Sequence, residues 1–185
     1  MAKDRLGEYR RKRRVAETPE PDGAGAPHPE ATPGRFVIQQ HSATRLHWDL
    51  RLERDGVLVS WALPSCLPLD PDKNAKAVHT EDHPLEYIDF HGEIPKGNYG
   101  AGAMTIWDRG TYEAEKFEPA KVIVTLKGER AQGKYALFRA GKDERDWMIH
   151  RMDPAPEWLE PIPEDLQPMT AMDGALPGDE KAWAY

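Results

Sequence analysis

The stretch His47-Trp48-Asp49-Leu50-Arg51-Leu52 alternates polar and apolar side chains without a break. Successive side chains of a β-strand point to opposite faces, so the pattern predicts a strand with one polar and one apolar face. The polar face carries His47, Asp49 and Arg51, and His41 lies a few residues upstream. This strand therefore points to a site for a divalent metal ion and an anion.

Strand-like patterns separated by turn residues continue from Arg35 to about Asp153. Asp55-Gly56 is a strong two-residue hairpin signal between strands expected at His47–Glu53 and Val57–Leu63. Further strands are expected at residues 35–40, 75–80, 85–91, 103–108, 111–116, 121–127, 134–139 and 147–152. Without an amphipathic helix of three or more turns between them, they predict a mainly β, antiparallel sandwich or closed barrel.

The composition changes at both ends of this core. Residues 1–34 are basic and then rich in proline and glycine, which predicts a mobile arm with a short helix near Tyr9. Residues 35–153 form the predicted barrel domain, and residues 154–185 read as an acidic, proline-rich linker. The sequence thus predicts one folded domain with an extension on each side.

Charge and cysteine content limit the classes of protein that fit. The net charge is −7, but residues 1–14 carry +5, which leaves −12 for the remainder. Contact with a polyanion is therefore expected to be local, although a solubilising tail would also explain the basic run. The single Cys66 excludes an internal disulfide, and no apolar run suits a signal peptide or membrane span. We expect a soluble, cytoplasmic protein without a membrane partner.

Two imidazoles and one carboxylate suit a divalent ion such as Mn, Fe, Co or Zn and leave coordination positions open. His41, His47 and Asp49 are the expected ligands, and Arg51 beside them suits a phosphate or carboxylate. The alternative is that these residues are only the surface polar side chains of an amphipathic strand.

A second candidate cluster follows at residues 80–87. His83 precedes a proline and is therefore biased to an extended backbone, from which it could act as a general acid or a phosphate donor. Tyr87 could supply a phenol hydrogen bond, although each residue alone is more often structural. The glycine-rich residues 92–102 lack a P-loop ending and predict a tight loop.

Taken together, these pieces resemble the 3′-phosphoesterase module of bacterial DNA ligase D, a component of non-homologous end joining. The similarity covers the N-terminal segment and the whole core, with the matching pieces in order. They are Tyr9 to Arg13, Thr18 to Pro21, His41 to Glu53, Asp55 to Leu58, Ser60 to Ala62, Glu81 to Leu85, Ile94 to Gly97, Tyr99 to Gly102 and Trp107-Asp108.

The resemblance implies a compact antiparallel β-barrel with a polar active-site channel and a Mn²⁺-dependent site. It also implies a hydrolase that acts on DNA 3′ ends of primer-templates carrying a 3′-ribonucleotide or a 3′-phosphate. Such an enzyme removes a terminal ribonucleoside by phosphodiester cleavage and then removes the 3′-phosphate to leave a hydroxyl. A ligase domain in the same protein and other end-joining proteins are the implied partners.

The resemblance also assigns roles by position. His41, His47 and Asp49 match its metal ligands, whereas Arg51, His83 and Tyr87 match residues that hold and activate the scissile phosphate. The positions used mainly in the phosphomonoesterase step are matched by Arg13, Glu20 and Glu81. The sequence departs from the commoner pattern at Arg14, at Ser65-Cys66 and at Asn74-Ala75, all near the part that handles the terminal monoester.

The end of the chain has a separate similarity. Pro168 to Met172 and Trp183 to Tyr185 resemble the approach to the adenylated-lysine motif of an ATP-dependent ligase domain. We therefore expect a fragment or natural truncation of a protein in which a ligase domain follows.

Two other classes of protein fit part of the pattern. A non-haem Fe(II) oxygenase would use His47 and Asp49 with His91 or His150 as a distal third ligand. A non-catalytic DNA-end-binding module would use the basic segment for phosphate contacts and keep the histidine cluster without a role.

Overall fold

The computed structural model describes residues 4–14, 16–25 and 33–158. The helical elements within these ranges are α1 (Gly7–Lys12) and the 3₁₀ helix η1 (Leu85–Asp89). The strands are β1 (Gly34–Ser42), β2 (Leu46–Arg54), β3 (Val57–Leu63), β4 (Asn74–His83), β5 (Gly92–Ile94), β6 (Gly102–Glu118), β7 (Lys121–Gly128), β8 (Gln132–Arg139) and β9 (Asp146–Arg151). The residues from 159 onward, for which a linker and a ligase-like motif are expected, lie outside the described residues.

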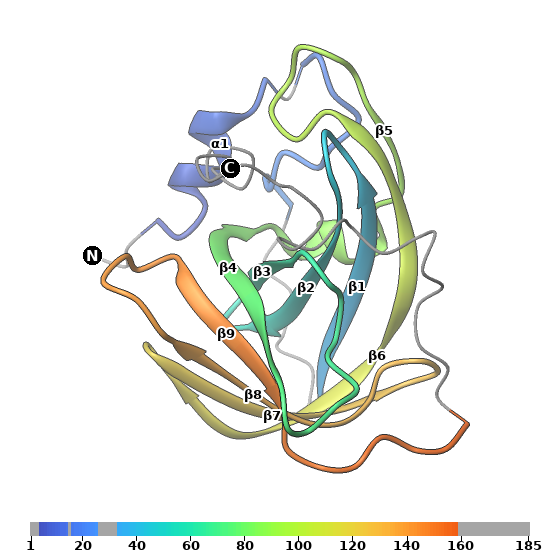
Figure 1. The fold of residues 1–185 in the computed structure, drawn as a ribbon. Helices are drawn as coiled ribbons and strands as arrows, with labels where there is room; N and C mark the ends of the chain where they lie inside the picture. The colour runs from blue at the N-terminus through green and yellow to red at the C-terminus, as the bar shows by residue number, and fades with distance from the viewer. Residues whose placement is uncertain (1–3, 15, 26–32, 159–185) are drawn as a thin grey trace.

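Eight of the strands close into an antiparallel barrel (Figure 1). Their order is β1-β2-β3-β4-β9-β8-β7-β6, and β6 pairs back with β1 to complete the ring. The short strand β5 pairs with β6 outside this ring. The predicted mainly β, antiparallel architecture is confirmed, and the closed ring selects the barrel over the sandwich.

The barrel interior is apolar. Its core draws buried side chains from all eight barrel strands, including Trp48, Leu50 and Leu52 of β2, each 0% exposed. Because strand side chains alternate, His47, Asp49 and Arg51 point to the outer face of the same strand. The polar residues of the candidate site therefore lie on the outside of the barrel wall.

A second apolar cluster covers part of this outer face. It combines residues from the N-terminal segment, the barrel wall, η1 and β5, namely Tyr9, Val37, Leu58, Leu85, Tyr87, Ile88, Phe90, Ile94 and Met104. The site is thus enclosed between the outer barrel wall and a cover of N-terminal and loop segments.

The hairpins set the strand register. Asp55 and Gly56 have φ values of 51° and 79°, as a type I′ turn requires, and they join β2 to β3. The antiparallel pairing of β1 with β2 places His41 opposite His47 and Gln39 opposite Asp49. All four side chains therefore belong to one face of the sheet.

The described part of the N-terminal segment, residues 4–14 and 16–25, packs against the barrel. Tyr9 of α1 is completely buried, and its hydroxyl donates a 2.6 Å hydrogen bond to the carbonyl of Pro21. Arg5 forms a 2.9 Å ion pair with Asp82 of β4. The described part of this segment packs on the barrel through contacts distant in sequence, which composition cannot reveal.

Two local predictions are wrong. Residues 85–91 do not form a strand, because Tyr87 N–H donates to the Pro84 carbonyl and Phe90 N–H to the Tyr87 carbonyl, which are the i to i+3 bonds of η1. The strands expected at residues 103–108 and 111–116 are one continuous strand, β6.

Among the described residues, no helix combines the length and the apolar character needed to cross a membrane.

Replacing Leu50 with alanine should lower the free energy of unfolding by about 2–5 kcal/mol, because the side chain is fully buried in the barrel core. Leu69→Ala is the control, since Leu69 is only half-buried and lies outside both apolar clusters. Urea unfolding followed by tryptophan fluorescence measures both variants. Equal losses would contradict the placement of Leu50 inside the barrel.

Candidate active site

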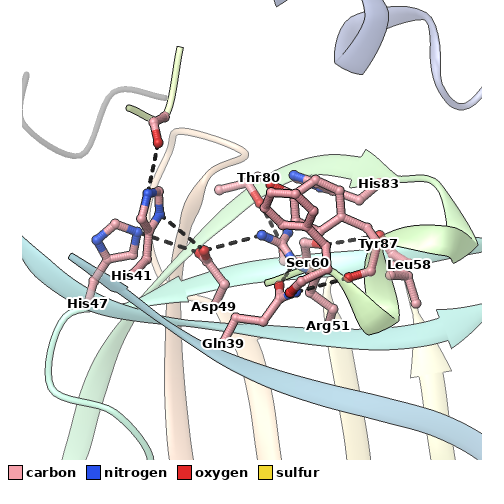
Figure 2. A network of polar contacts seen from close by, with 12 residues as sticks. Gln39, His41, His47, Asp49, Arg51, Leu58, Ser60, Thr80, His83 and Tyr87 are labelled. Atoms are coloured by element: carbon pink, nitrogen blue, oxygen red, sulfur yellow. Dashed lines mark hydrogen bonds and ion pairs between the residues drawn. The ribbon is translucent and has the colours of Figure 1, made fainter. Parts of the chain in front are cut away.

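His41, His47 and Asp49 converge on one point of the outer wall (Figure 2). One ligand atom from each lies within 4.8 Å of the others, and all three side chains are buried. His41 Nδ1 is 3.5 Å from Asp49 Oδ2, and His47 Nε2 is 3.7 Å from Asp49 Oδ1. The predicted triad is therefore assembled and can hold a metal ion.

Backbone carbonyls orient both imidazoles. His47 Nδ1 lies 3.0 Å from the Arg45 carbonyl, and His41 Nε2 lies 2.8 Å from the Gly100 carbonyl. A carbonyl oxygen only accepts, so each of these nitrogens carries the hydrogen, and the other ring nitrogen presents its lone pair toward Asp49. Lone pairs that converge on a carboxylate favour a cation among them, and this donor set fits a divalent transition metal.

A small pocket of about 30 Å³ opens beside the triad. A buried water needs about 10–15 Å³, so this space suits an ion or one or two waters. Its lining residues are Arg13, His41, His47, Asp49, Arg51, Thr80, Glu81, His83, Tyr87, Ile94, Tyr99, Gly100 and Met104.

Arg51 is a buried cation in direct contact with the triad. Its Nη2 donates to Asp49 Oδ2 at 3.2 Å, and its Nε donates to Gln39 Oε1 at 2.7 Å. The guanidinium also stacks on the Tyr87 ring, 4.7 Å from its centroid. Its buried Nη1 has no hydrogen-bond partner among the described residues. A buried donor without a partner is costly, so an anion in the pocket would satisfy it.

A second group of charged residues joins the N-terminal segment to β4. Arg13 donates to Glu20 at 2.8 Å and to Glu81 at 2.7 Å, and its Nη2 lies 3.0 Å from His83 Nε2. Lys12 adds a 3.1 Å ion pair with Glu81. Arg13 is thereby held over the pocket by two carboxylates.

His83 and Tyr87 lie next to this group. His83 Nδ1 is 2.8 Å from the Glu81 carbonyl, so it carries the hydrogen and Nε2 accepts from Arg13. The Tyr87 hydroxyl donates a 3.0 Å hydrogen bond to Glu20. Both side chains are tied to the N-terminal segment in this structure.

Burial and neighbouring charges shift several pKa values. Burial would raise the pKa of Asp49, but the Arg51 guanidinium beside it outweighs burial and holds that pKa well below its usual range. Glu81 also has a lowered pKa, because Arg13 and Lys12 overcome its burial. Burial, together with Arg51 and Arg13, lowers the pKa of His83 well below its usual value. Burial also lowers the pKa of His47, so both histidines are neutral near pH 7.

The structure brings all nine predicted site residues into one connected set. Eight line the pocket, and Glu20 joins them through Arg13 and Tyr87. The departures from the family pattern do not line it: Arg14 and Ser65 are exposed, and Asn74 hydrogen-bonds His150 instead. Neither His91 nor His150 reaches the triad, so the oxygenase alternative loses its distal ligand among the described residues.

Three contributors were not anticipated from the sequence: Gln39, the Gly100 carbonyl and the Arg45 carbonyl. Gln39 stands two residues before His41, and residues two apart in a strand share one face, so the sequence could have predicted that Gln39 faces the site. The carbonyls carry no such signal, because any residue type offers one.

Fold and pocket together define a β-barrel protein with a two-histidine, one-carboxylate metal-binding triad and an adjoining arginine on its outer wall. A family model described as the DNA Ligase D 3′-phosphoesterase domain matches residues 39–139. The chain belongs to this family, which confirms the resemblance of its motifs.

Longer relatives carry the same module. The multifunctional non-homologous end joining protein LigD of Mycolicibacterium smegmatis is 47% identical over 194 residues, covering 98% of this chain and 25% of that protein. Its namesake in Pseudomonas aeruginosa is 42% identical over 156 residues, covering 80% of this chain and 19% of that protein. The chain therefore spans a quarter or less of the length of these relatives.

Asp49→Asn should weaken Mn²⁺ binding at least about 100-fold, because it removes the only anionic ligand of the triad. Titration of Mn²⁺ followed by electron paramagnetic resonance measures this affinity. Glu53→Gln is the control, since Glu53 is a buried carboxylate of the same strand that pairs with Arg35 at 2.7 Å. Unchanged Mn²⁺ affinity in Asp49→Asn would contradict the assignment of the ligands.

His83 should make the metal-free protein less stable in acid. Its pKa is lower in the folded state than in the unfolded chain, so below about pH 6.5 the unfolded chain takes up a proton that the folded state excludes. Stability should therefore fall as the pH drops from about 6.5 toward the folded pKa, by up to about 1.4 kcal/mol per pH unit for this residue.

The check is urea unfolding of the wild type and His83→Gln between pH 7 and pH 5. The variant should show a shallower dependence, with the remaining slope due to groups such as His47 and His79, whose pKa values burial also lowers. Identical slopes would show that His83 is not held neutral by its surroundings.

Proposed function

We propose that this chain is a metal-dependent phosphoesterase that processes DNA 3′ ends. Its substrates would be strands that end in a 3′-terminal ribonucleoside or a 3′-phosphate, and Mn²⁺ would be its metal. The observation that carries this proposal is the convergence of His41, His47 and Asp49 beside Arg51, whose buried Nη1 has no partner among the described residues. Metal and arginine side by side suit a phosphate that contacts both.

The residues divide the chemistry between charge and proton transfer. A divalent ion held by the triad would supply a Lewis acid and a bound water of lowered pKa. Arg51 would hold the phosphoryl oxygens and stabilise the negative charge that grows on them in the transition state. The described cover over the pocket would keep bulk water away and strengthen both effects.

His83 would handle a proton at the phosphate. In the free protein it is neutral, and Arg13 occupies its Nε2. A phosphate between Arg51 and His83 would offset the two guanidinium groups that lower this pKa, so His83 could then carry a proton to the leaving oxygen. Tyr87 would hold the phosphate with its hydroxyl after releasing Glu20.

Both reactions are hydrolyses at phosphorus. In the first, a water oxygen bonds to phosphorus, the bond to the 5′ oxygen of the terminal ribonucleoside breaks, and that oxygen takes a proton. The strand is left with a 3′-phosphate. In the second, water attacks this phosphate, the bond to the 3′ oxygen breaks, and a 3′-hydroxyl remains. Arg13, Glu20 and Glu81 are the residues that we assign mainly to the second step.

The biological setting is inferred from the relatives. The names of these relatives describe multifunctional non-homologous end joining proteins. We propose the same setting for this chain, in the bacterial cytosol, with DNA ends as substrates and a ligase domain and other end-joining proteins as partners.

The purified chain with Mn²⁺ should shorten a primer-template that bears a single 3′-ribonucleotide, passing through a 3′-phosphate to a 3′-hydroxyl. Gel analysis of the products, with 3′-ribonucleotide and 3′-phosphate primers tested separately in Mn²⁺ and in Mg²⁺, separates the two steps.

Arg51→Ala should lower the rate of the first step about 100- to 1,000-fold, because it removes a hydrogen-bond donor to the transition state.

Arg109→Ala is the matched control, since Arg109 is largely exposed and pairs with Asp89 away from the pocket. Its rate should equal that of the wild type. An unshortened primer with the wild type in Mn²⁺ would contradict the proposed function. Oxoglutarate-dependent turnover would favour the oxygenase, and DNA-end binding unaffected by His41→Ala, without turnover, would favour the binding module.

A further inference from the structure

Gln39 is a completely buried residue beside Arg51, and both the oxygen and the nitrogen of its side-chain amide form hydrogen bonds. It comes from β1, is 0% exposed, and lies opposite Asp49 in the strand register. Its Oε1 accepts from Arg51 Nε at 2.7 Å, and its Nε2 donates to the carbonyls of Tyr87 and Phe90, each at 2.9 Å. One side chain thus connects β1, the arginine of β2 and the helix η1 (Figure 2).

The orientation of this amide is determined by its partners. Arg51 Nε can only donate, so it must face the amide oxygen, and the two carbonyls can only accept, so they must face the amide nitrogen. A flip of the amide would break all three hydrogen bonds. Gln39 therefore fixes the direction of the guanidinium and the position of η1, which carries Tyr87.

The two buried arginines of the pocket differ in the charge of their partners. Arg13 lies between two carboxylates, Glu20 and Glu81, which cancel its charge locally. Arg51 has one carboxylate partner, Asp49, and that group also belongs to the metal-binding triad. Its other side-chain hydrogen bond goes to the neutral amide of Gln39. Arg51 is therefore the guanidinium with positive charge left for an anion.

We propose that Gln39 is a positioning residue that aims Arg51 at the substrate phosphate without adding a second carboxylate to the partners of its guanidinium. This inference rests on the proposed function, because phosphate is the group that Arg51 would hold. A carboxylate at position 39 would accept the same bond from Arg51 but would compete with the phosphate for its charge. It would also face the carbonyls of Tyr87 and Phe90 without a hydrogen to donate.

The test compares Gln39→Met and Gln39→Glu, with Gln40→Met and Gln40→Glu as matched controls. Gln40 is the next residue of β1, points to the other side of the strand and is half-buried. Inorganic phosphate is the probe, its binding measured by the relaxation of its ³¹P resonance with Mn²⁺ added. Mn²⁺ affinity is measured separately by electron paramagnetic resonance, and folding by circular dichroism.

Gln39→Met should weaken phosphate binding about 10- to 100-fold, the range for a hydrogen bond that holds a charged group, and Gln39→Glu should weaken it further. Mn²⁺ affinity should stay within about threefold of the wild type in both variants, and the Gln40 variants should bind phosphate normally. Wild-type phosphate affinity in either Gln39 variant would overturn the inference. So would a parallel loss of phosphate and Mn²⁺ binding in both, which would indicate only a structural role.

Should neither Gln39 variant fold, nuclear magnetic resonance of the wild type decides. The hydrogen on Arg51 Nε should exchange slowly with solvent, because it is bonded to Gln39. Added phosphate should shift the Nη resonances of Arg51 much more than its Nε resonance. Rapid exchange of the Nε hydrogen would overturn the inference. The proposed function is tested independently by primer shortening. If the wild-type chain does not shorten primers, the proposed function is rejected. If the Gln39 variants of that chain still lose phosphate binding, the role of Gln39 in positioning Arg51 is nevertheless supported.

Discussion

The in-register antiparallel pairing of β1 with β2 is the constraint on which the site depends. It sets His41 opposite His47 and Gln39 opposite Asp49, while alternation along each strand turns these residues to one face. A slip of one residue in either strand would turn that strand's polar side chains into the apolar barrel core. The core, which holds Trp48, Leu50 and Leu52, therefore fixes the register and with it the geometry of the triad.

Charge balance explains how so many ionisable groups can be buried beside this face. Three cationic side chains, Lys12, Arg13 and Arg51, face three carboxylates, Asp49, Glu20 and Glu81, through ion pairs of 2.7–3.2 Å. Because His47 and His83 are neutral near pH 7, the set is close to neutral without a metal ion. A divalent ion would add two positive charges, which a phosphate would in turn balance.

The sequence predicted the features of the structure that are set by neighbouring residues, namely the strands, one hairpin turn and the metal-binding triad. The strand period located β2 and β3, the Asp55-Gly56 turn fixed their hairpin, and the spacing of His47 and Asp49 located the triad. The sequence could not show that Arg13 would cross to His83 and Glu81, nor that the Gly100 carbonyl would orient His41, because those contacts join distant segments. Residues 85–91 were misread because apolar residues of a short 3₁₀ turn resemble a strand.

The central claim is that these three side chains of β1 and β2 hold one metal ion beside Arg51. Anomalous diffraction from crystals of this chain grown with Mn²⁺ and inorganic phosphate tests it most directly. We predict one strong anomalous peak bonded to His41 Nδ1, His47 Nε2 and a carboxylate oxygen of Asp49, with phosphate density that reaches Arg51 Nη1. An anomalous peak elsewhere, or none at saturating Mn²⁺, would contradict the account.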